Sequence, residues 1–68
     1  MEFTKLEKEI LYKIDEITGG FGEEQKYILE CLEEQNYDIK IIRGVIGSLV
    51  KKGELIYQDN YIYMKNAE

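Results

Sequence analysis

The sequence predicts an α+β domain built from three helices followed by a C-terminal two-stranded β-hairpin. Apolar residues recur every three or four positions in three separate segments, which is typical of amphipathic helices. Gly19 and Gly53 follow the first and third of these segments, at positions where helices commonly end. Two short runs rich in isoleucine and tyrosine come after Gly53, as expected for strands. We expect helices at about 4–18, 23–35 and 38–52 and a hairpin at about 54–64, in a single domain over 1–68.

The first predicted helix begins at a capping box. In Thr4-Lys5-Leu6-Glu7 the threonine hydroxyl and the glutamate carboxylate can each accept a hydrogen bond from the other residue's backbone amide. An inward stripe then follows at helical spacing, made of Leu6, Ile10, Ile14 and Ile17. The pair Gly19-Gly20 ends this helix.

The second predicted helix carries an acidic first turn. Glu23 and Glu24 stand where the helix dipole favours negative charge. Its inward stripe consists of Tyr27 or Ile28, then Cys31 and Leu32, with Gln35 as a further candidate. We expect Cys31 to be a buried small apolar residue and Phe21, in the preceding connector, to fill the core.

The third predicted helix has two contrasting faces. Asp38 is a suitable N-cap, and the core-facing residues are Ile39, Ile42, Val45, Ile46, Leu49 and Val50. The opposite face gathers Lys40, Gly44, Gly47, Ser48 and Lys51. Each glycine costs about 1 kcal/mol relative to alanine in a helix interior and leaves the backbone open to close approach. The functional interpretation is approach by a partner, and the alternative is close packing by another part of the same chain.

The register of the hairpin depends on its turn. If Asp59-Asn60 forms a two-residue turn, one face carries Leu55, Tyr57, Ile62 and Met64, and the other carries Ile56, Gln58, Tyr61 and Tyr63. A three-residue loop would shift this register. One face must cover the helices, because an isolated hairpin is at best marginally stable.

Charge is distributed unevenly along the chain. The formal net charge is −5 and the pI is about 4.7, yet the segment 39–53 contains Lys40, Arg43, Lys51 and Lys52 and no acid. The chain has one cysteine and no histidine, so no internal disulfide, metal site or nucleophilic triad is expected. No apolar run approaches the length of a membrane span. We therefore expect a cytoplasmic protein that is not an enzyme and needs no cofactor.

The passage from the third helix into the first strand resembles the winged-helix variant of the helix-turn-helix. Ile46, Leu49, Gly53, Leu55 and Ile56 occupy its apolar-x-x-Leu-x-x-x-Gly-x-Leu/Ile pattern, and the resemblance covers nearly the whole chain. The amino-acid sequence from Arg43 to Gly53 is similar to that of small phage-type and bacterial regulator domains. The resemblance implies double-stranded DNA as partner, with the third helix in the major groove. It directs Lys40, Ile41, Arg43, Gly44 and Gly47 toward the groove and Ser48, Lys51 and Lys52 toward phosphates.

Two functions follow from these observations. The first is a small DNA-binding transcription regulator, acting as a homodimer, in which Arg43 reads guanine edges. The second is a protein-binding module with the same fold, such as a phage inhibitor of a host or defence protein whose acidic helices mimic nucleic acid. The acidic pI, the glutamates of the second helix and a hairpin turn without lysine or arginine favour the second. Outward residues of the hairpin, Ile56, Tyr61 and Tyr63, would then form a dimer or protein interface, although tyrosines more often border a core.

Overall fold

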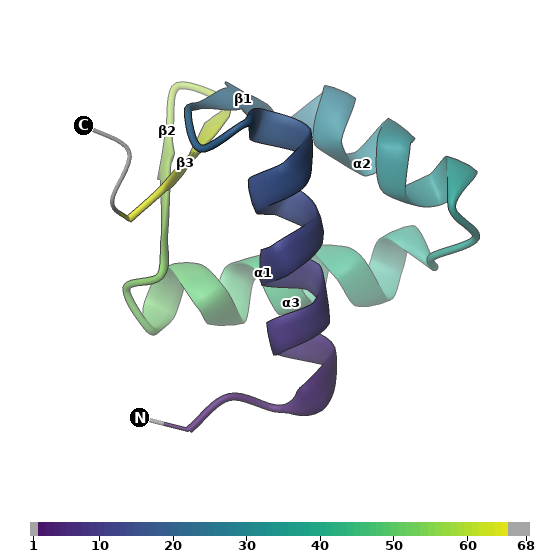
Figure 1. Ribbon diagram of the computed structural model, residues 1–68, viewed down its shortest axis with the longest axis horizontal. Coiled ribbons are helices and arrows are strands. Elements are labelled where there is room, and N and C mark those ends of the chain that lie inside the picture. Colours follow the sequence, from purple (N-terminus) through teal and green to yellow (C-terminus); the bar gives the residue numbers. More distant parts are fainter. Residues whose placement is uncertain (1, 66–68) are drawn as a thin grey trace.

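A computed structural model of the chain describes residues 2–65, in which three helices pack with a small antiparallel sheet. The elements in chain order are α1 (Lys5–Thr18), β1 (Glu23–Glu24), α2 (Gln25–Glu34), α3 (Ile39–Lys51), β2 (Leu55–Gln58) and β3 (Tyr61–Met64). The α+β class is thus confirmed. In Figure 1, α1 crosses over α3 at a steep angle, with the sheet on one side of α1 and α2 on the other.

Side chains fix the starts of α1 and α3. The Thr4 hydroxyl accepts from the Glu7 amide at 3.1 Å, and the Glu7 carboxylate accepts from the Thr4 amide at 2.7 Å, so the expected capping box is present. Asp38 caps α3 by accepting from the Lys40 amide at 2.8 Å. α1 ends at Gly19, whose φ of 65° is the left-handed conformation that glycine adopts without strain.

β2 and β3 form a hairpin with a two-residue turn. Leu55 pairs with Met64 and Gln58 pairs with Tyr61, and the turn residues Asp59 and Asn60 both have positive φ, at 53° and 67°. Positive φ at both turn positions matches the twist of the flanking strands. This register places Leu55, Tyr57, Ile62 and Met64 on the face toward the helices, where Leu55 and Ile62 are buried.

The third strand, β1, was not expected from the sequence. Glu23 and Glu24 do not open the helix as predicted; they pair with Ile62 and Tyr61 of β3, and the sheet order is β1-β3-β2. The Gln25 amide continues this contact by donating to the Asn60 carbonyl at 2.9 Å. Pairing with β3 therefore holds these residues extended, and α2 begins only at Gln25.

One apolar core lies between the helices and the inner face of the sheet. Its fully buried members come from every helix and from both strands of the hairpin: Ile10, Ile14, Ile28, Leu32, Ile42, Leu49, Leu55 and Ile62. The prediction that Phe21 fills this core is wrong, because its side chain is 70% exposed. The turn from Thr18 to Phe21 and the short β1 carry it outside, and Ile62 and Leu55 close the core instead. Cys31 is only half-buried, which also differs from the expectation.

Candidate nucleic-acid interface

The outer face of α3 is formed by Lys40, Gly44, Gly47 and Lys51, all of which are exposed. A helix turns by about 100° per residue, so these four positions fall in one narrow sector. The opposite side of α3 packs into the core through Ile42, Val45, Ile46 and Leu49. α3 therefore presents to solvent a strip of bare backbone with a lysine toward each end.

The strip is open and is not covered by the described chain. A Cβ atom added to Gly44 or to Gly47 would meet no atom within 4 Å beyond the neighbouring backbone of α3 itself. Close packing by another element was the alternative explanation for these glycines, and nothing in residues 2–65 packs there. The bare backbone is thus accessible to another molecule.

Three cations surround this strip without a carboxylate partner. Lys40, Arg43 and Lys51 are exposed, and within residues 2–65 none of them forms an ion pair. At a rise of about 1.5 Å per residue, Lys40 and Lys51 stand roughly 16 Å apart along the helix axis. Their ammonium groups are free to meet anions at either end of the strip.

Arg43 lies on the flank of α3 that faces the hairpin. It lines a recess of about 430 Å³ together with Glu24, Gln25, Tyr57 and Asn60. It also borders a recess of about 240 Å³ beside Gly47 and Val50. The Tyr57 hydroxyl donates to the Asn60 side chain at 3.0 Å, which holds its ring against this opening. Ile41, on the other flank of α3, is 53% exposed.

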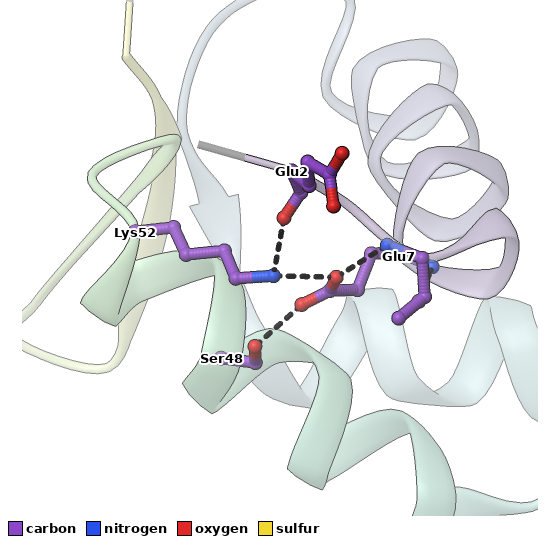
Figure 2. Close-up of polar contacts among 5 residues, drawn as sticks. Glu2, Glu7, Ser48 and Lys52 are labelled. Carbon is purple, nitrogen blue, oxygen red and sulfur yellow. Dashed lines mark hydrogen bonds and ion pairs between the residues drawn. The ribbon is translucent and has the colours of Figure 1, made fainter.

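Ser48 and Lys52 point away from this face and toward α1. Lys52 Nζ lies 2.7 Å from Glu7 Oε1 and 2.9 Å from the Glu2 carbonyl, and it stands 5.1 Å from the centre of the Phe3 ring. The Ser48 hydroxyl donates to the second oxygen of Glu7. Figure 2 shows the Glu7 carboxylate between the side chains of Ser48 in α3 and of Lys52, the residue that follows α3. Through these contacts with Glu7, both residues hold the start of α1 against the end of α3.

The Glu7 carboxylate is buried and charged. Hydrogen bonds from Lys52, Ser48 and the Thr4 amide lower its pKa from 4.5 to about 2, in that order of importance, against the opposing effect of burial. Sequence reasoning recognised Glu7 as part of the capping box but missed its contacts with α3. Those contacts span 41 and 45 positions, so no local pattern reveals them.

The residues expected at a protein interface lie together on the outer face of the sheet. Ile56 is 47% exposed and Tyr61 is 38% exposed. The rings of Tyr61 and Tyr63 stack with their centres 6.1 Å apart. This surface is separate from the outer face of α3.

Neither a family model, a curated protein nor a solved structure matches this chain. Within residues 2–65, no helix has both the length and the apolar character needed to cross a membrane.

Proposed function

We propose that the protein binds double-stranded DNA through the outer face of α3, as a small winged-helix transcription regulator would. The observation that carries this proposal is the set of three unpaired cations, Lys40, Arg43 and Lys51, around the uncovered glycine strip. The arrangement of three helices and a hairpin supports the same proposal, because it agrees with the resemblance described above.

The dimensions of α3 suit the major groove. The groove is about 12 Å wide and a helix with its side chains is about 10–12 Å across, so missing side chains at Gly44 and Gly47 allow α3 to sit deeper. Lys40 and Lys51, at the two ends of the strip, are placed to meet phosphates of the flanking backbone. Arg43 and Ile41 rise on either flank, where a guanidinium can pair with guanine and an aliphatic group can contact the thymine methyl.

The proposed contact set is smaller than the sequence suggested. Ser48 and Lys52 support the surface by anchoring α3 to Glu7 and are not assigned to phosphates. The hairpin turn, Asp59-Asn60, has no cation, so we expect no electrostatic contact from it. Three neutralised phosphates predict a salt slope of roughly −2.7 in log K against log salt concentration. Such a complex is weak, and two copies on neighbouring half-sites would strengthen it.

Fluorescence anisotropy with a labelled duplex of about 20 base pairs at about 50 mM salt tests this function. We expect measurable binding by the full chain and a several-fold loss for Arg43→Ala, Lys40→Ala and Lys51→Ala. Lys8→Ala, which removes an exposed lysine from α1, is the matched control and should bind like the parent. Absence of binding at low salt, or equal affinity of the Arg43, Lys40 and Lys8 variants, would contradict the proposal.

A further inference from the structure

The outer face of the sheet carries side chains in two cross-strand rows. The register places Ile56 beside Tyr63 in one row and Gln58 beside Tyr61 in the next. β1 extends the second row, because Glu24 pairs with Tyr61. Side chains of directly paired residues lie on the same face of a sheet, so Glu24 belongs to this surface.

The apolar side chains on this face are contiguous. The stacked rings of Tyr61 and Tyr63 form its centre, and Ile56 flanks Tyr63 on β2. A Cβ at Gly22 would overlap the Tyr63 ring, so this ring lies over the glycine backbone. Phe21, the next residue along, is strongly exposed. A contiguous exposed apolar patch of this kind commonly marks an interaction site.

The charges next to Tyr61 on this face are negative, while Lys26 and Arg43 line a recess at its border together with Glu24. Glu24 stands beside Tyr61 and Asp59 lies in the adjacent turn, and both are exposed. At the other end of the sheet, Lys65 lies 4.0 Å from Glu54, so its charge is partly compensated. Phosphate groups would be repelled by this environment, which makes nucleic acid an unsuitable occupant even though tyrosine rings can stack on bases. A cation beside the rings would be attracted by the carboxylates and by the ring faces.

The size of the patch favours a short segment over a second copy of the chain. Strands of four residues make a platform about 13 Å long and about 10 Å wide. A stable protein interface buries about 800 Å² on each partner, which is much more than this platform offers. Two copies, each with a net charge of −5, would also repel one another.

We propose that the outer face of the sheet docks a short cationic segment of another protein. An aliphatic or aromatic side chain of that segment packs on Tyr61, Tyr63 and Ile56, and a neighbouring lysine or arginine faces Glu24. Its aromatic centre belongs to the sheet and not to α3, although Glu24 also lines the recess that Arg43 borders.

Titration of the ¹⁵N-labelled full chain with three synthetic peptides tests the proposal. The peptides are about eight residues long, enough to cross the sheet, and alternate Lys with Leu, Lys with Ser, or Glu with Leu. We expect saturable amide shifts in β2 and β3 with the Lys-Leu peptide alone. Tyr61→Ser should weaken this binding at least about fivefold, as truncation of a central aromatic contact does. Ile56→Ser, on the other strand of the hairpin, is the second variant and should also weaken binding of the Lys-Leu peptide.

Two matched changes separate this interaction from general stickiness. Tyr12→Ser removes a tyrosine of α1 that is even more exposed than Tyr61 and should leave peptide binding unchanged. Glu24 makes no capping hydrogen bond with its side chain, so Glu24→Lys should fold normally and should bind the Glu-Leu peptide in preference to the Lys-Leu peptide.

Three results would overturn the proposal. Equal binding of the Lys-Leu and Lys-Ser peptides would show that charge alone acts. Shifts centred on α3 would place the site elsewhere. Concentration-dependent dimers in sedimentation, abolished by Tyr61→Ser, would make a second copy the occupant.

Discussion

Glu7 is the residue with the most demanding set of contacts in this small chain. Its carboxylate accepts hydrogen bonds from the Thr4 amide, the Lys52 ammonium and the Ser48 hydroxyl, although the side chain is almost fully buried. A buried carboxylate needs such partners, because desolvation of an unpaired charge is very unfavourable. Loss of this one group leaves the Ser48 hydroxyl without its acceptor and leaves Lys52 with the Glu2 carbonyl alone.

We expect Glu7→Gln to destabilise the fold in a pH-dependent way. Because the pKa of Glu7 falls from 4.5 to about 2 on folding, its stabilising contribution is fully present above pH 4.5 and is lost as the pH falls toward 2. The gap in unfolding free energy between the parent and Glu7→Gln should therefore be largest near neutral pH and should narrow in acid. Chemical denaturation followed by circular dichroism across this range measures it.

Glu16→Gln is the control for this experiment, since Glu16 is an exposed carboxylate on the same helix. Its effect on stability should be small at every pH. A Glu7→Gln deficit that stays constant from neutral pH to pH 2 would show that the charge of Glu7 is not what stabilises the contact.

At the scale of the element, α3 combines low helix propensity with an uncovered surface. Gly44 and Gly47 have room for a side chain, and glycine inside a helix costs about 0.5–1 kcal/mol relative to alanine. We expect Gly44→Ala and Gly47→Ala each to raise the unfolding free energy by about this amount while lowering DNA affinity, because a methyl group keeps the backbone away from the groove.

Thermal unfolding and duplex titration of the same samples test both halves of this prediction. Gly53→Ala is the contrasting variant, because Gly53 has a φ of 80°, which strains any other residue, and it should destabilise the fold. Alanine variants that gain stability and keep full DNA affinity would mean that nothing approaches the strip.

The elements also show which parts of the fold the sequence could reveal. Local signals were sufficient for the capping box of α1, the Asp38 cap and the glycine stops, because caps act within one turn of a helix. β1 escaped detection because two glutamates have little strand propensity and are held extended only by pairing with β3. The prediction for Phe21 was wrong for a different reason. Hydrophobicity alone does not indicate whether a loop residue points into the core or into solvent.

The sequence predicted the exposed residues of the candidate surface but wrongly added Ser48 and Lys52. Gly44, Gly47, Lys40 and Lys51 lie opposite the apolar stripe of α3, so helical periodicity alone predicts that they face solvent. Ser48 and Lys52 lie on a flank of the helix. Whether a flank is covered depends on where α1 crosses, and that information is absent from the sequence of α3 itself.

At the scale of the whole molecule, the acidic surface should limit DNA binding by long-range repulsion. Glu30 and Glu33 on α2 are exposed, and the net charge of −5 opposes the approach of phosphates. We expect Glu30→Gln combined with Glu33→Gln to raise DNA affinity several-fold at about 50 mM salt. The gain in affinity should shrink at about 300 mM salt, because salt then limits electrostatic interactions between exposed charges to a few ångströms.

Anisotropy at both salt concentrations measures this difference. Glu2→Gln provides the comparison, because it removes one exposed carboxylate from the N-terminal segment rather than from α2. A gain that persists at high salt would indicate a direct clash with DNA in place of long-range repulsion.

The Glu7 contact also joins two parts of the fold that are far apart along the chain. The same carboxylate closes the first turn of α1 through Thr4 and secures the last turn of α3 through Ser48 and Lys52 (Figure 2). Fraying of one helix end therefore releases the other, so the two turns should open as one cooperative unit. Their amide protons should exchange with solvent at matched rates, and the rates should diverge when Glu7 is replaced.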